Sequence, residues 1–178
     1  LVGLVMQYPE YQLFEETCAR DIAYGPRNMG LDEAEVQRRV REAAAFVGLS
    51  DELLEKSPFE LSGGQKRRVA IAGVMAMHPR VLVLDEPTGN LDIANEQLLM
   101  RLAKKAAQER HIAVLSSLHD LNQALSLGDR FFFLKDGVIT CTVPRDGVTS
   151  GILRDALGGD LRLVEVEGER IVLHGRAT

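Results

Sequence analysis

The sequence has 178 residues, of which 46% are hydrophobic and 26% charged, and this is enough for one domain with a real core and a smaller subdomain. Its formal net charge of −5 and pI near 5.4 argue against a general nucleic-acid binder, which normally has a basic surface. We see no signal peptide, no apolar run of about 18 residues and no metal-ligand spacing of the cysteines, so we expect no export, membrane span or disulfide.

The chain opens on a strand pattern, Leu1 to Met6, and Gln7 follows it directly. Residues 8–14 mix turn residues with polar and aromatic ones, which favours a loop. No lysine in the sequence follows a glycine, so the phosphate-binding loop GxxxxGK[ST] does not occur in it.

The next segment reads as helices separated by turn residues. Thr17 is a cap for a first helix, which we expect the Gly25-Pro26 pair to end. Asp32 begins a second helix with a capping box, and Gly48 closes it. Together these patterns predict a small helical subdomain.

A further helix begins at Ser62, where Gln65 completes a capping box. Gly63 and Gly64 lie in its first turn, so no side chain blocks the free backbone N–H groups there. The helix dipole adds about half a positive charge at the same place, and a phosphate group fits such a site. Taken alone, the same residues could be only a helix cap.

Pro79 ends that helix, and Val81 to Leu84 is an apolar run typical of a strand buried on both faces of a parallel sheet. Asp85 and Glu86 follow at its carboxyl end, where open α/β sheets bind their ligands. Asp85 can face a hydrated Mg²⁺ and Glu86 can face a water molecule. The alternative is a solvated strand end without chemistry.

The remaining elements follow in a regular order. Residues 95–110 have helical composition, and Ile112 to Leu115 predict the next parallel strand, which His119 follows at a short distance. Residues 129–142 and 161–173 read as two hairpins.

Three motifs now resemble those of the ATP-binding cassette (ABC) ATPases. LSGGQ at 61–65 resembles the signature motif, VLVLDEPT at 81–88 the Walker B motif, and NLD at 90–92 the D-loop. Agreement of three separate motifs in order and spacing argues against chance. The resemblance implies an α/β fold that is part of a P-loop NTPase domain, with a mostly parallel sheet, a small helical subdomain and a C-terminal hairpin appendage.

The resemblance also implies roles for single residues. The expected catalytic residues are Glu86, which polarises the attacking water, and His119 of the H-loop, which contacts the γ-phosphate. Asp85 is expected to hold the metal, together with Gln7 of the Q-loop. The expected nucleotide-binding residues are Gln7, Leu61, Ser62, Gly63, Gly64, Gln65 and Asp92.

As a member of this family the protein is expected to be the ATP-hydrolysing subunit of an importer, with ATP and Mg²⁺ as cofactors. The expected partners are a second ATPase subunit, identical or different, and a transmembrane permease or coupling subunit, without nucleic acid. The expected location is cytoplasmic, at the inner face of the membrane. Because the phosphate loop does not occur, we expect the sequence to be a piece of a longer subunit that is inactive alone.

Within the family, the sequence of roughly residues 1–85 resembles that of the ATPases of energy-coupling factor importers, which take up cobalt, nickel, biotin and other vitamins. The motifs GNLD, SSLHDLNQAL and LKDGVI look more like iron-siderophore or haem importer ATPases. That branch, a non-transport ATPase of the superfamily and a non-catalytic interaction module remain the alternatives.

The expected divisions of the domain follow the motifs. They are a strand with the Q-loop (1–9), the helical subdomain (10–60), the core that carries the signature, Walker B, D-loop and H-loop motifs (61–143) and the C-terminal appendage (144–178).

Overall fold

The computed structural model of the chain describes residues 1–89 and 91–175. These form two compact units, Leu1–Ser117 and Leu118–Thr178, which are described one at a time. Asn90, the first residue of the NLD motif, lies outside the described residues.

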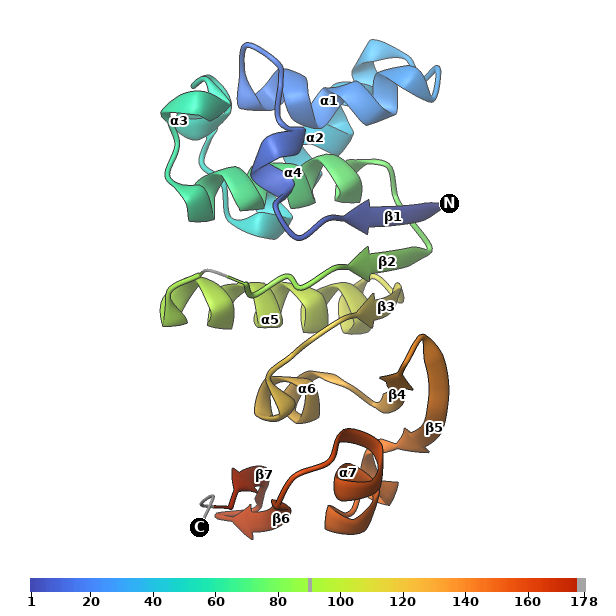
Figure 1. Cartoon of the computed structure of the whole chain (residues 1–178). Helices are drawn as coiled ribbons and strands as arrows, with labels where there is room; N and C mark the ends of the chain where they lie inside the picture. Colours follow the sequence, from blue (N-terminus) through green and yellow to red (C-terminus); the bar gives the residue numbers. More distant parts are fainter. Residues whose placement is uncertain (90, 176–178) are drawn as a thin grey trace. The chain divides into compact units, whose positions relative to one another are not determined.

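The first unit is built on a parallel sheet in the order β1-β2-β3 (Figure 1). Its strands are β1 (Val2–Val5), β2 (Val81–Leu84) and β3 (Ala113–Ser116). The last residues of the strands lie opposite one another, Val5 beside Leu84 and Leu84 beside Ser116. The residues that follow the three strands therefore meet at one edge of the sheet.

Helices surround this sheet in the first unit. Their bounds are η1 (Pro9–Gln12), α1 (Cys18–Asn28), α2 (Glu33–Val47), α3 (Asp51–Leu54), η2 (Pro58–Glu60), α4 (Gly63–Ala76) and α5 (Ile93–Glu109). Helix α4 packs against β1 and contacts α1 and α2 on its other side (Figure 1). A Cβ on Gly3 would lie 2.4 Å from Val74 Cγ1, so α4 approaches β1 closely only because residue 3 is a glycine.

Thr17 and Asp32 cap their helices as the sequence predicts, but the Glu35 carboxylate of the expected box accepts hydrogen bonds from Arg38 and Arg39. Thr17 Oγ1 accepts a hydrogen bond from the Arg20 N–H, and Asp32 Oδ1 accepts one from the Glu35 N–H. Gly48 ends α2 with a φ of 71°, the left-handed conformation that glycine adopts without strain.

One helix boundary was predicted wrongly. Helix α1 does not stop at Gly25-Pro26 but continues to Asn28, with Pro26 inside it. Two features of the structure explain the difference. Gly25 has no Cβ to clash with the proline ring, and the Pro26 side chain is fully buried, so packing offsets the lost backbone hydrogen bond.

Strand β2 is buried on one face only. Leu82 and Leu84 are each 2% exposed, whereas Val81 and Val83 are half-buried. The prediction of burial on both faces is therefore wrong for the described residues, because the closely packed helix α4 lies on the face that Gly3 shares with Leu82.

The described residues of the second unit hold two antiparallel hairpins, as the sequence predicts, together with short helices. Its elements are α6 (Leu121–Leu127), β4 (Arg130–Lys135), β5 (Val138–Pro144), η3 (Arg145–Gly147), α7 (Ser150–Leu157), β6 (Leu161–Val166) and β7 (Glu169–His174). Leu125, Phe133, Val148 and Leu153 lie in its core. In the part of the chain that the structure describes, no helix has the length and apolar character needed to cross a membrane.

Candidate active site

The carboxyl edge of the sheet brings together two residues that are 79 positions apart. Gln7 follows β1 and Glu86 follows β2, and the Gln7 amide Nε2 donates a hydrogen bond of 2.6 Å to Glu86 Oε2. The parallel register of the two strands is the cause, because it makes them end side by side. The Glu86 carboxylate is thus fixed in a half-buried position.

The backbone of Glu86 adopts a conformation that few non-glycine residues have. Its φ is 41°, in the left-handed region, which costs of order 1–3 kcal/mol and persists where the surroundings impose it. Here the Glu86 N–H donates to Ser117 Oγ (2.8 Å) and the Glu86 carbonyl accepts from the Gly89 N–H (3.1 Å). Strain of this kind is common at functional sites.

Asp85 is exposed at the same edge. Its Oδ1 accepts a hydrogen bond of 2.9 Å from the Ser117 hydroxyl, which therefore bonds to both acidic residues. None of the described residues forms a cluster of three His, Cys, Asp or Glu side chains that could hold a metal. Mg²⁺ needs no such cluster, since it is often bound through one or two carboxylates, water and substrate phosphates, and the exposed Asp85 carboxylate fits that role.

The start of α4 forms the predicted capping box. The Ser62 N–H donates to Gln65 Oε1 (2.9 Å) and the Gln65 N–H donates to Ser62 Oγ (3.4 Å). Leu61, 7% exposed, anchors the turn in the core. Gly63 is exposed and a Cβ on it would meet nothing within 4 Å, so the helix start is open to a ligand.

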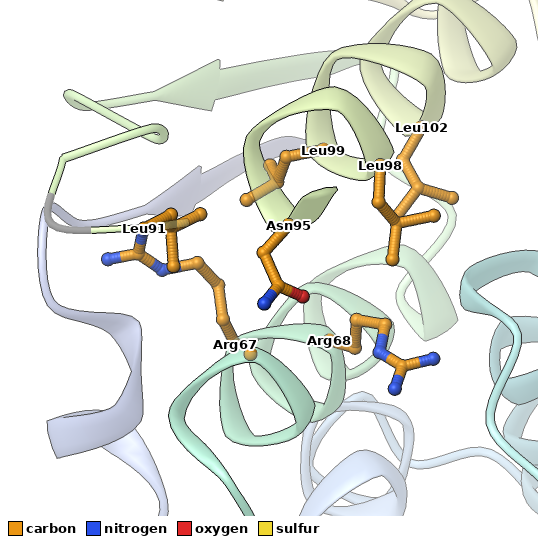
Figure 2. A pocket seen from close by; sticks show the side chains of 8 residues that line it. Arg67, Arg68, Leu91, Asn95, Leu98, Leu99 and Leu102 are labelled. Carbon is orange, nitrogen blue, oxygen red and sulfur yellow. The ribbon is translucent and has the colours of Figure 1, made fainter. Parts of the chain in front are cut away.

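Asp92 caps the start of α5 and lies close to this helix start through Asn95. Its Oδ1 accepts from the Asn95 N–H and its Oδ2 from Asn95 Nδ2, both at 2.8 Å, and the backbone bond lowers the pKa of Asp92. Figure 2 shows the small cavity between α4 and α5, with Asn95 and Arg67 in its wall. Its volume of about 10 Å³ has room for one water at most, not a nucleotide.

Two residues of the site were missed by the sequence analysis. Ser117 directly follows β3, and a serine at a strand end in line with Asp85 is the signal that could have found it. Arg67 lies one helical turn after Gly64 and is 3% exposed, and burial lowers the pKa of its guanidinium. In the sequence, Arg67 is one of three consecutive basic residues, Lys66 to Arg68, and nothing in that run distinguishes the residue that is buried.

The predicted site residues thus form two groups in the first unit. Gln7, Asp85 and Glu86 meet at the sheet edge, and Ser62 to Gln65 lie with Asp92 at the two helix starts. His119 belongs to the second unit, where it precedes the α6 cap Asp120. Its catalytic role stays a prediction.

Comparison with known proteins shows the family of the chain. Residues 2–89 match the family model described as ABC transporter. The chain belongs to the ABC transporter family. Its α/β fold with a parallel sheet is that of the ABC ATPase domain, a P-loop NTPase, as the motifs predict.

The relatives of the chain belong to one branch of the ABC family. This chain is 51% identical, over 138 residues, to the energy-coupling factor transporter ATP-binding protein EcfA2 of Caldanaerobacter subterraneus. The aligned residues cover 78% of this chain and 48% of the relative. Several other bacterial EcfA2 proteins are similar to it. The chain spans about half the length of these curated relatives.

Two solved structures of ABC proteins resemble the chain. One is cbiO1 of Clostridium perfringens, part of the ABC transporter complex cbiONQ, with a TM-score of 0.75, 36% identity and coverage of 82% of this chain and 57% of that one. The other is the ATP-binding cassette MJ0796, a dimer in a post-hydrolysis state bound to ADP and Pi, with a TM-score of 0.69, 30% identity and coverage of 83% and 64%.

Proposed function

We propose that the full-length protein is the ATP-binding and ATP-hydrolysing subunit of an ABC importer of the energy-coupling factor type. The observation that carries the proposal is the Glu86 carboxylate, fixed at the sheet edge by Gln7 and by its own left-handed backbone. The names of the EcfA2 relatives support the energy-coupling factor branch.

The nucleotide site is completed by a second subunit. The open helix start from Ser62 to Gly64 offers backbone N–H groups to an anion. In our proposal this helix start binds the terminal phosphate of an ATP held mainly by the other subunit, with Asp92 at the seam. The dimeric form of the similar cassette MJ0796 supports a two-subunit arrangement.

Glu86 orients the attacking water and accepts its proton as the water oxygen bonds to the γ-phosphorus and the bond to ADP breaks. Gln7 holds the Glu86 carboxylate in place by its hydrogen bond, which keeps the carboxylate from rotating away from the water. Asp85 and the Gln7 amide oxygen would hold Mg²⁺, which neutralises charge on the phosphates when bound. In the second unit, His119 would contact the γ-phosphate.

The helical subdomain is the proposed contact with a transmembrane coupling subunit at the inner face of the membrane. Large apolar side chains stand exposed on it, among them Tyr11 (84%), Phe14 (57%) and Phe59 (65%). Exposed aromatic residues of this kind are enriched where proteins bind one another.

The test is Glu86→Gln in the full-length protein, assembled with its second subunit and membrane partner. We expect ATP hydrolysis to fall by at least a hundredfold while ATP-dependent dimerisation is kept, since the amide fills the same space but cannot accept the proton. Glu109→Gln, the same change on an exposed residue at the end of α5, is the control and should hydrolyse ATP normally. Normal hydrolysis by Glu86→Gln would contradict the proposal.

A further inference from the structure

We propose that Arg67 is a positioning residue that couples the phosphate-binding start of α4 to the catalytic carboxylate at the sheet edge, and thereby couples the two nucleotide sites of the dimer. The inference rests on the proposed function, because it takes Glu86 as the residue that activates water.

Arg67 reaches both segments that hold Glu86. Its Nη2 donates to the Gln7 carbonyl (2.7 Å), and its Nη1 donates to the carbonyls of Pro87 (2.8 Å) and Gly89 (3.2 Å). Gln7 in turn bonds to the Glu86 carboxylate, and Pro87 is the next residue after Glu86. One side chain on α4 therefore fixes the Q-loop and the turn after the Walker B strand at once.

Only arginine suits this position. A planar guanidinium carries five N–H donors in a fixed fork, so it can bond to carbonyls on two different segments, whereas a lysine ammonium is a compact point charge. Burying the charge is costly, and Glu10, whose carboxylate is 3.8 Å from Arg67 Nη2, offsets part of the cost. A buried charge that bonds mainly to backbone carbonyls fixes a loop geometry more than it adds stability.

The link runs between two nucleotide sites. Arg67 follows Gly64 by one turn of α4, so a small tilt of the helix start also moves the guanidinium. In the proposed dimer that helix start binds the ATP of the other subunit, while Gln7 and Glu86 act on the ATP of their own subunit. Phosphate binding at one site is thus passed through Arg67 to the water-activating residue of the other.

Coupling requires an element with two arrangements, and the surroundings of Arg67 supply a second one. Arg67 Nε and Glu10 Oε2 are both buried, and neither has a hydrogen-bond partner among residues 1–89 and 91–175. The guanidinium can therefore exchange the Gln7 carbonyl for the Glu10 carboxylate without losing a partner. That exchange would release the Q-loop from α4.

The experiment measures ATP hydrolysis against ATP concentration for the full-length complex with its membrane partner. We expect cooperative hydrolysis in the wild type, and in Arg67→Lys a fall in kcat of about tenfold or more, with a Hill coefficient near 1 and ATP-dependent dimerisation unchanged within about threefold. The matched control is Arg39→Lys. Arg39 is also largely buried and donates to the Ala76 carbonyl at the other end of α4, so its replacement should keep the Hill coefficient.

A second variant, Glu10→Gln, keeps the three carbonyl bonds of Arg67 and replaces the charged alternative acceptor by a weaker, neutral amide oxygen, so it should lower the Hill coefficient with kcat within about twofold of the wild type. It decides the matter if Arg67→Lys does not fold, as judged by thermal unfolding. A wild type that hydrolyses ATP without cooperativity, or variants with unchanged kcat and Hill coefficient, would overturn the inference and leave the proposed function standing. A wild type without ATP hydrolysis would instead overturn the proposed function.

Discussion

Gly64 and Asn95 approach each other so closely that no side chain fits between them. A Cβ added to Gly64 would lie 2.5 Å from Asn95 Oδ1 and 2.8 Å from its Cγ, whereas a Cβ on the neighbouring Gly63 would meet nothing within 4 Å. Asn95 is itself bonded to the cap residue Asp92. The signature and D-loop motifs are therefore packed against each other through one glycine.

Replacing the two glycines by alanine should give opposite results. Gly64→Ala should lower the free energy of unfolding by about 1–2 kcal/mol, because Asn95 must move and lose its bond to Asp92. Gly63→Ala should be neutral or raise stability by about 0.5 kcal/mol, since alanine is the better helix former. Urea unfolding of the full-length protein without nucleotide measures both.

The double variant Gly64→Ala with Asn95→Ala provides the control. It removes the side-chain atoms that the new methyl group would meet, so most of the cost of Gly64→Ala should disappear. If Gly64→Ala alone is as stable as the wild type, the Asn95 side chain can move away without loss of stability. The close packing then contributes nothing to the free energy of unfolding.

The separation of two interacting residues along the chain decides whether the sequence alone predicts their contact. The capping box of Ser62 and the caps at Thr17 and Asp32 were predictable because each involves residues three positions apart. The continuation of α1 through Pro26 was not, since burial against other helices decides it. Arg67 and Ser117 were missed because their partners lie 60 and 32 positions away, and only the folded sheet brings them together.

Gln7→Glu should make ATP hydrolysis depend on pH. The variant places a second carboxylate against Glu86 at the 2.6 Å hydrogen bond, so the two acids share a proton and the pKa of one of them rises. While the pair holds this proton, the carboxylate that should accept the proton of water is less available and kcat falls. As the pH is raised from 7 to 9 the shared proton is lost and kcat should recover in part.

Gln7→Ala separates this charge effect from the loss of the bond. It removes the Gln7–Glu86 contact without adding a carboxylate, so its kcat should be low by a constant factor over the same pH range. Parallel pH profiles of the two variants would show that proton sharing is not the cause of the Gln7→Glu defect.

Glu42 makes the stability of the fold depend on pH. It accepts a hydrogen bond from Arg110 and one of 3.1 Å from Arg38, with His78 Nε2 at 3.6 Å, and the bond from Arg110 is the main cause that lowers the pKa of Glu42. A carboxyl whose pKa is lower in the folded than in the unfolded state stabilises the fold above the unfolded pKa. This contribution is lost as the pH falls through the folded pKa.

Glu42→Gln should therefore cost up to about 1 kcal/mol of unfolding free energy at pH 7 and progressively less as the pH falls below the ordinary glutamate pKa. Urea unfolding of both proteins between pH 7 and the acid limit of folding measures the difference. Glu109→Gln, whose carboxylate is 4.0 Å from Lys105 Nζ on the surface, is the control and should change little. A constant difference across this range would exclude ionisation of Glu42 as its cause.

The two cysteines should differ in reactivity. Cys18 is fully buried at the start of α1, and burial, with a smaller effect of Asp21, raises the pKa of its thiol to about 11. Only about one thiol in a thousand is then ionised at pH 8, and the thiolate is the reactive form. Cys141 is only half-buried. Iodoacetamide should therefore label Cys141 in the folded full-length protein and label Cys18 only in urea, as read by peptide mass spectrometry. In Cys141→Ser, neither position should be labelled in the folded protein, and urea should expose Cys18 alone. Rapid labelling of Cys18 in the folded protein would mean that the start of α1 opens far more often than its burial implies.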